Sequence, residues 1–341
     1  MKLRDYIIRR LLLAIPVIIG VLAITFVLSY VVGNPIALYT TERTPASAIP
    51  GIMAEHGLNQ PIYIQFFFYL RDLASGDWGY SRTARMNVTA AIAVKLPATI
   101  ELSLFAMIFA VVLGIPLGII SATRKDKPVD HVTRIFALAG VSMPIFWFAL
   151  ILKYIFYYQF LVWHLPYLPE GGRYSLTTIN YTPITNFILI DSLITGNFVL
   201  FFDAIIHIIL PAFALGYLTL AVITRMMRSS MLEVLKEDYI TLARSKGLRE
   251  RVVIYKHALR NAMIPTVTVI GLAFGGLMTG AVLTETIFSW PGLGMWSTRA
   301  ILTSDIPSIN AFTLLVALIF VSANLIVDLV YGALDPRIRY G

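Results

Sequence analysis

Motifs for common catalytic reactions are missing from this chain of 341 residues. A phosphate-binding loop ends in Gly-Lys-Ser/Thr, and the sequence contains no Gly-Lys pair. It contains neither the HExxH helix of a zinc protease nor the GxSxG turn of a serine hydrolase. There is no cysteine, and the five histidines, at 56, 131, 164, 207 and 257, lack metal-ligand spacing. We therefore expect no catalytic residue, no metal site and no ATP hydrolysis on this chain.

Ionisable side chains within apolar stretches are the next candidates, because a charge is costly in lipid and usually faces a partner or a cavity. Six residues qualify, namely Glu101, Lys153, Asp203, His207, Glu285 and Asp328. Lys153, Glu285 and Asp328 are our candidates for polar groups of a translocation path or of a helix bundle. A proton relay through such groups would indicate an ion-gradient-driven secondary transporter, which is the alternative interpretation. That class typically has inverted halves and a broken midplane helix, and we detect neither in the sequence.

The charged stretch 225–263 is the most informative segment of the chain. Its first half predicts a helix with one apolar face, formed by Leu232, Leu235, Tyr239, Leu242 and Ala243. Gly247 is expected to end that helix, since glycine readily adopts positive φ. A second short amphipathic piece follows, and Pro265 begins the next apolar stretch. A helix, a glycine turn and a second helix would form a compact knob, which we interpret as a docking surface for another protein.

The elements that carry these residues are predicted from composition. Hydrophobic residues make up 58% of the chain and charged residues 13%, with a mean hydropathy of +0.78, which is too apolar for a soluble domain. Six stretches reach the roughly 20 apolar residues that a membrane-spanning helix needs. They are 11–32, 98–122, 133–158, 202–223, 264–286 and 310–333. We predict an all-α, multi-pass protein of the cell membrane that forms a single transmembrane domain over 1–341, because a helix satisfies its own backbone polar groups.

The distribution of cations predicts the orientation. With a cytoplasmic N-terminus, the internal segments contain 19 of the 27 Lys and Arg residues, as the positive-inside rule requires. Asp191, Gly196 and Asn197 interrupt the apolar stretch 187–202, and counting it as a span would place the cations of 224–263 outside. We therefore predict an interfacial or re-entrant helix at 187–202 and two cytoplasmic termini. The net charge of +8 belongs to the cytoplasmic face, so no nucleic-acid partner is expected.

Two long external segments, 33–97 and 159–201, are rich in Pro, Gly and Tyr. Short helices are predicted in them at 62–74 and 187–202. We expect these two segments to form a cap over the external mouth.

The order of residues in 238–265, which runs Asp-Tyr, Ala-Arg, Lys-Gly, His-Ala-Leu-Arg-Asn and Pro, resembles one known family. That family is the inner-membrane permeases of binding-protein-dependent ABC importers, in the dipeptide/oligopeptide/nickel subfamily. The general signature begins Glu-Ala-Ala and later carries Leu-Pro, whereas this chain has Thr241-Leu242-Ala243 and Leu259-Arg260, departures typical of the peptide subfamily. Further segments resemble the same family, at 6–16, 57–65, 76–81, 96–124, 142–147, 207–211, 228–232, 285–294 and 334–339. The N-terminal YIIRRLL pattern is similar to the first of the two permeases in such systems.

This resemblance implies an ABC-importer type I permease fold and a heteromeric assembly. The expected partners are a second homologous permease, two cytoplasmic ATPases that bind ATP and Mg, an external solute-binding protein and membrane lipid. No cofactor is expected on this chain. The residues expected to couple to an ATPase are Asp238, Tyr239, Thr241, Leu242, Ala243, Arg244, Lys246, Gly247, His257, Arg260 and Asn261. Dipeptides, oligopeptides, nickel and oligosaccharides all remain open as substrates.

Overall fold

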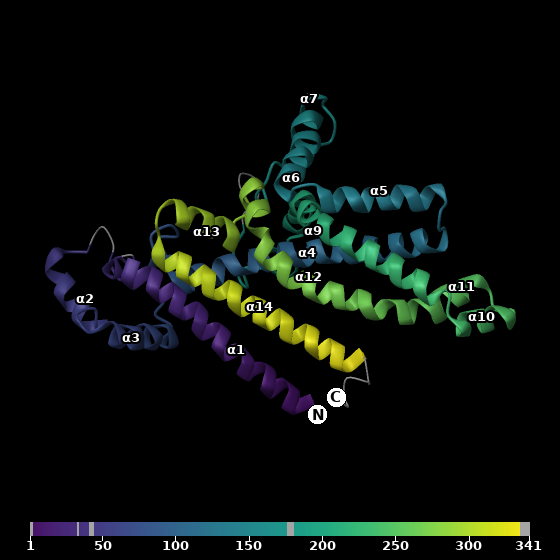
Figure 1. Cartoon of the computed structure of the whole chain (residues 1–341). Coiled ribbons are helices and arrows are strands. Elements are labelled where there is room, and N and C mark those ends of the chain that lie inside the picture. Colours follow the sequence, from purple (N-terminus) through teal and green to yellow (C-terminus); the bar gives the residue numbers. More distant parts are fainter. Residues whose placement is uncertain (1–2, 33, 41–43, 176–180, 335–341) are drawn as a thin grey trace.

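A computed structural model describes residues 3–32, 34–40, 44–175 and 181–334, most of them in helices (Figure 1). The helices are α1 (Leu3–Phe26), α2 (Ile49–Glu55), α3 (Ile62–Ser75), α4 (Val88–Thr123), α5 (Pro128–Ser142), α6 (Ile145–Lys153), α7 (Phe160–Val162), α8 (Ile188–Ile194), α9 (Phe198–Val234), α10 (Asp238–Ser245), α11 (Glu250–Val252), α12 (Leu259–Ile287), α13 (Leu293–Leu302) and α14 (Ile306–Leu334). Strands β1 (Tyr80–Ser81) and β2 (Met86–Asn87) pair antiparallel, Tyr80 opposite Asn87. They are the only strands in the described part of the chain.

Six helical stretches are long and apolar enough to cross a membrane. They are Ile8–Val31, Val88–Thr123, Ile145–Val162, Phe198–Val234, Glu250–Thr279 and Ile306–Ile326. The predicted all-α fold with six spans is thereby confirmed, and 187–202 is not a span of its own. α8 ends at Ile194, and Asn197 caps α9 by accepting a hydrogen bond from the Leu200 amide at 3.0 Å.

The predicted third span, 133–158, is wrong in its boundaries. Its first residues belong to α5, which ends at Ser142, and the candidate span begins only at Ile145. Between them Met143 is extended, with φ −86° and ψ 133°. Pro144 explains the break, because its ring disfavours helical geometry in the preceding residue and it has no amide hydrogen to donate. In Figure 1, α6 and α7 consequently leave the direction of α5 at a steep angle.

α4 and α9 are the central pair of the bundle, and small residues set their separation. On α4, Ala106, Ala110, Gly114 and Gly118 recur every fourth residue and are fully buried or nearly so. A Cβ atom built on Gly118 would lie 2.6 Å from Met227 Cβ and 2.8 Å from the Thr224 carbonyl oxygen of α9. Helices in lipid associate through such close packing, because lipid supplies no hydrophobic force between them. This contact, which we call the α4–α9 seam, therefore depends on small residues at these four positions.

The ends of the bundle agree with the predicted sidedness. In Figure 1 α10 and α11 lie at one end of the bundle, whereas α2, α3 and α13 lie toward the other. The cation-rich turn between α4 and α5 lies at the same end as α10. The two internal segments between spans that are expected to be cytoplasmic are thus gathered at one end. Which side faces the cytoplasm stays a prediction.

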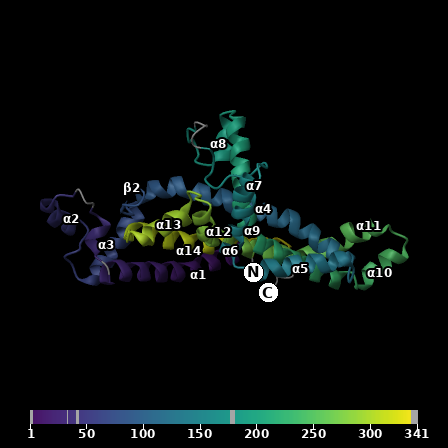
Figure 2. The same ribbon diagram turned by 90° about the horizontal axis from the view of Figure 1, so that it is seen from above.

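The two segments expected to form a cap lie in different places. Helix α3 (Ile62–Ser75) confirms the helix predicted at 62–74, and it packs with α2 near the end of α1 (Figure 1). α7 projects from the middle of the bundle in Figure 1 and α8 does so in Figure 2, in each view away from α2 and α3. The described parts of 33–97 and 159–201 therefore lie apart in these views, and the cap over the external mouth stays a prediction.

We expect Gly118→Leu to destabilise the protein, because its side chain would force α4 away from α9. Overpacking of this kind costs about 1–3 kcal/mol. Gly20→Leu in α1 is a matched control, since no heavy atom lies within 4 Å of a Cβ built there. The measurement is the thermal unfolding midpoint of the purified protein in detergent. Equal midpoints for the two variants would contradict the role given to the seam.

Candidate functional site

The predicted knob forms at the end of α9 as two short helices around a glycine turn. α9 ends at Val234, a three-residue turn follows, and α10 runs from Asp238 to Ser245. The Gly247 amide then bonds to the Arg244 carbonyl at 2.9 Å and the Leu248 amide to the Ala243 carbonyl at 3.4 Å. These two bonds form a Schellman motif, which requires a left-handed residue, and Gly247 has φ +74°. The expectation that Gly247 ends the helix is confirmed.

The predicted apolar face of this helix is right in part: Leu232, Leu235 and Ala243 pack in one apolar cluster. It is wrong for the other two residues, because the turn at 235–237 separates α9 from α10 and resets the helical phase. Ile240 and Ala243 are the residues of α10 that point inward. Tyr239 and Leu242 are instead exposed, with 38% and 55% of their surface accessible. The knob therefore presents two large apolar side chains on the outer face of α10, and the other residues of that face are charged or polar.

The inward face of α10 sits on the ends of three spanning helices. Ile240 and Ala243 belong to one buried cluster with Ile119 and Ala122 of α4, Met227 and Met231 of α9, and Ala258 and Ala262 near the start of α12. Ile240, Met227 and Met231 have no accessible surface. A displacement of α10 must therefore shift at least one of these helices, since close-packed interiors do not deform freely.

Polar contacts fasten the two sides of the knob together. Arg244 Nη2 lies 2.7 Å from Glu250 Oε1, joining α10 to α11 across the turn, and this carboxylate raises the pKa of Arg244. Both side chains are exposed, so the pair contributes little to stability. Asn261 Nδ2 donates to the Tyr239 hydroxyl at 2.6 Å, which ties α12 to α10.

The other residues expected to couple to an ATPase also lie in this knob. Asp238 is exposed in the first turn of α10, where a negative charge is favoured by the helix dipole. Thr241 and Lys246 are exposed on α10 and its turn, Arg260 is exposed on α12, and His257 is half-buried in the π-helical turn Val253–Ala258. The structure thus brings all eleven residues into one surface region, and only Ala243 among them is buried.

A buried ion pair at the same end of the bundle escaped the sequence reasoning. Asp130 of α5 has no accessible surface and accepts two hydrogen bonds of 2.7 Å from Arg228 of α9. Ser121 of α4 donates to the same carboxylate at 2.5 Å. The bonds from Arg228 hold the pKa of Asp130 well below its usual range. The sequence did contain a signal for this pair: Asp130 is an acidic residue in the first turn of α5, beside the cations of the α4–α5 turn.

The candidates for polar groups of a path or bundle lie away from the knob and do not meet there. Lys153 Nζ donates to the Ile287 carbonyl at 3.2 Å and lies 3.1 Å from Glu170 Oε1. Glu285 is fully buried and accepts hydrogen bonds from the Thr99 hydroxyl at 2.6 Å and the Met295 amide at 3.0 Å. Asp328 falls outside the residues whose side chains are described. Lys153 and Glu285 thus fasten the turn between α12 and α13 to α6 and α4.

A second buried pair anchors the long segment that follows α7. Arg173 Nη2 donates to Glu101 Oε2 of α4, and the Leu189 amide of α8 donates to Glu101 Oε1 at 3.0 Å. Glu101 stood out in the sequence as an acid within a span, but its partner, 72 residues away, could not be identified from the sequence. The pair explains how a charge is accommodated in the apolar part of α4.

Comparison with known proteins covers nearly the whole chain. A family model for the inner membrane component of binding-protein-dependent transport systems matches residues 114–340, and one for the N-terminal part of such membrane components matches 3–103. The dipeptide transport system permease protein DppB of Alkalihalophilus pseudofirmus is 46% identical, over 98% of this chain and 99% of that protein. DppB of Escherichia coli K12 is 45% identical over the same shares of the two chains. The oligopeptide transport system permease protein AppB of Bacillus subtilis is 36% identical, again over 98% and 99%.

We expect Asp130→Asn to lower the free energy of unfolding by about 2–4 kcal/mol, somewhat less than for a fully buried pair because the Arg228 side chain keeps 20% exposure. Since pairing depresses the Asp130 pKa, the stabilisation is complete above the unfolded-state pKa of about 3.9 and is lost only in more acidic solution. The difference in unfolding free energy between the wild type and Asp130→Asn should therefore be constant around neutral pH.

Asp126→Asn is the matched control, because Asp126 is an exposed acid in the same turn. Chemical unfolding followed by circular dichroism measures both variants. If Asp126→Asn lowers the free energy of unfolding as much as Asp130→Asn does, the importance of the Asp130–Arg228 pair is contradicted.

Proposed function

The chain belongs to the inner membrane components of binding-protein-dependent transport systems and is a multi-pass permease subunit of an ABC importer, and we propose that its cargo is peptides. Two relatives named for dipeptide transport are 45–46% identical, whereas the relative named for oligopeptide transport is 36% identical. This order favours dipeptides over longer peptides. A second, homologous permease subunit would complete the translocation path, with the solute delivered by an external binding protein.

ATP hydrolysis would take place on two separate cytoplasmic subunits. The sequence lacks the Gly-Lys pair of a phosphate-binding loop, so ATP and Mg would be bound by those partners. This permease would contribute a docking surface and a gated path. Its own chemistry is limited to recognising the solute and changing shape.

The knob formed by α10, the Gly247 turn and α11 is the observation that carries this proposal. Tyr239 and Leu242 project outward, which suits insertion into an apolar cleft of an ATPase. No heavy atom lies within 4 Å of a Cβ built on Gly247, so the backbone of the turn is open to close approach. The sequence Thr241-Leu242-Ala243 followed by Gly247 is the part that resembles the coupling segment of the family.

Coupling would follow from the way the knob is seated. When two ATPases close on ATP, each would carry its docked α10 with it. Because Ile240 packs in one cluster with α4, α9 and α12, this movement would re-orient three spans together. The path would then open alternately to the two sides of the membrane, as alternating access requires.

We expect Gly247→Asp to abolish ATPase retention and uptake while leaving the protein in the membrane. A side chain at φ +74° costs on the order of 1 kcal/mol, and here it would also project into the space that the ATPase must occupy. Retention of the ATPases on the purified permease pair and uptake by proteoliposomes are the two measurements.

Gly76→Asp is a matched control for retention, because Gly76 ends α3 with φ +87° and also faces open space, at the other end of the bundle. It should retain the ATPases. Normal retention and normal uptake by Gly247→Asp would refute the coupling role.

Orientation is testable cleanly because the chain has no native cysteine. Tyr63→Cys in α3 should react with a membrane-impermeant maleimide in intact protoplasts, whereas Lys246→Cys after α10 should react only once the membrane is permeabilised. Both positions are exposed in this chain. Labelling of Lys246→Cys from outside in intact protoplasts would overturn the assignment of a cytoplasmic knob and cytoplasmic termini.

A further inference from the structure

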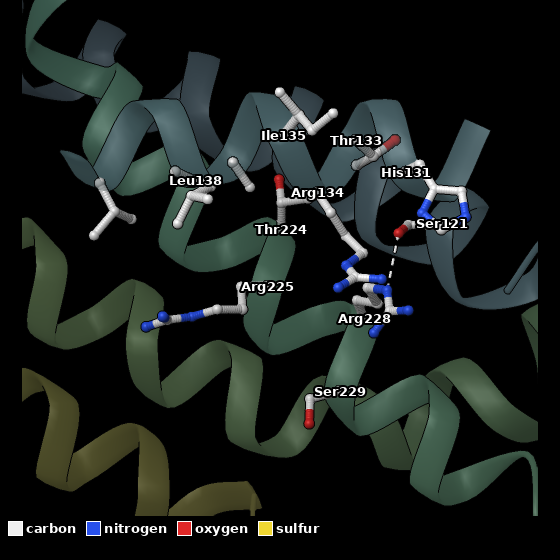
Figure 3. A pocket seen from close by; sticks show the side chains of 13 residues that line it. Ser121, His131, Thr133, Arg134, Ile135, Leu138, Thr224, Arg225, Arg228 and Ser229 are labelled. Atoms are coloured by element: carbon white, nitrogen blue, oxygen red, sulfur yellow. Dashed lines mark hydrogen bonds between the residues drawn. The ribbon is translucent and has the colours of Figure 1, made fainter. Parts of the chain in front are cut away.

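A groove between α5 and α9 opens at the same end of the bundle as α10. Its volume is about 510 Å³, and both helices contribute its walls (Figure 3). The groove takes no part in the docking surface described above. Because the groove is open to the surface of this chain, a ligand can enter it from outside.

Polarity changes along the groove in the direction of the helices. At the end nearest the α4–α5 turn it is lined by His131 and Arg134 of α5 and by Arg228 of α9. One to two turns further along α5 the lining becomes Leu138 and Val141, while α9 contributes Ala221 and the exposed Arg225. The lining therefore suits a ligand that is anionic at one end and apolar where it lies along α5.

Arg134 and Thr224 of the groove lack partners among the residues that the structure describes. No hydrogen bond or ion pair to Arg134 is found in the described part of the protein, although Figure 3 shows its side chain directed toward Arg228. Thr224 is 1% exposed, and its hydroxyl has no hydrogen-bond partner among the described residues. A buried hydroxyl without a partner costs free energy. Asp130 balances only one of the two positive charges of Arg134 and Arg228, so a second anion would be favoured beside them.

We propose that this groove binds one anionic phospholipid of the cytoplasmic leaflet. The phosphate would lie between Arg134 and Arg228, with an acyl chain along Leu138 and Val141. Arg228 already gives two hydrogen bonds to Asp130 but carries a further nitrogen, Nη1, for the phosphate. Basic pockets between spanning helices on the cytoplasmic side are suited to anionic headgroups.

The apolar continuation favours a lipid over an acidic segment of a partner protein. Ile135 and Leu138 are 68% and 67% exposed on α5, so the helix already presents a surface that suits acyl chains. Because Arg228 also holds Asp130, a bound lipid would brace the junction of α4, α5 and α9 on which the knob rests.

The test is native mass spectrometry of the whole purified complex, permease pair and ATPases together, titrated with phosphatidylglycerol, phosphatidylcholine or inorganic phosphate. Phosphatidylglycerol should bind with one tight site per copy of this chain, and phosphatidylcholine and free phosphate should bind far more weakly. Arg134→Gln should weaken phosphatidylglycerol binding roughly fivefold, the factor for one cation near an anionic lipid.

Thr224→Val separates ligand binding from folding, because it removes a hydroxyl that has no hydrogen-bond partner among the described residues. It should leave the unfolding midpoint unchanged or higher and still weaken phosphatidylglycerol binding. Arg124→Gln is the control, since Arg124 is an exposed cation at the end of α4 that does not line the groove. The proposal is overturned if phosphatidylcholine or free phosphate binds as tightly as phosphatidylglycerol. It is also overturned if Arg124→Gln weakens binding as much as Arg134→Gln, or if the second permease occupies the groove in the assembled complex.

Discussion

Close contact between α4 and α9 is the constraint on which the rest of this structure depends. In lipid, two helices gain stability from each other mainly by packing without gaps, and here the gap is closed by glycine and alanine at every fourth position of α4. Both helices are unusually long: 36 and 37 residues correspond to about 54 Å, against a hydrocarbon core of about 30 Å. The two helices therefore extend beyond the membrane, and α10 packs directly on their ends.

The buried charges mark where this frame is fastened to the remaining elements. Glu101 joins α4 to the segment after α7 through Arg173, and Glu285 joins the turn before α13 to α4 through Thr99. At the opposite end, Asp130 joins α5 to α9. Each carboxylate is satisfied by a specific donor, as a charge in a low-dielectric environment requires. A proton relay would instead need an unbroken chain of such groups, whereas Asp130 is bonded to Ser121 of α4, about five helical turns from Glu101.

The sequence predicts what depends on local pattern and misses what depends on partners far along the chain. Six spans follow from apolar length, helix 62–74 from its composition, and the left-handed turn at Gly247 from its residue type. The break at Pro144 was overlooked because the apolar run continues across it. The outward orientation of Tyr239 and Leu242 could not be predicted, since a three-residue turn changes the helical phase without leaving a clear signal. The partners of Glu101 and Asp130 are fixed only by the tertiary fold.

The central claim is that the outer face of α10 contacts an ATPase. A photo-reactive amino acid at Leu242 tests it most directly, with Leu302 as the reference because it is 80% exposed at the end of α13, toward the opposite end of the bundle. In the complex reconstituted in lipid, irradiation should cross-link the ATPase subunit to position 242, with a yield that changes when ATP is added, and should not cross-link it to position 302. An ATPase adduct from 302, or none from 242 in a complex that retains its ATPases, would contradict the account.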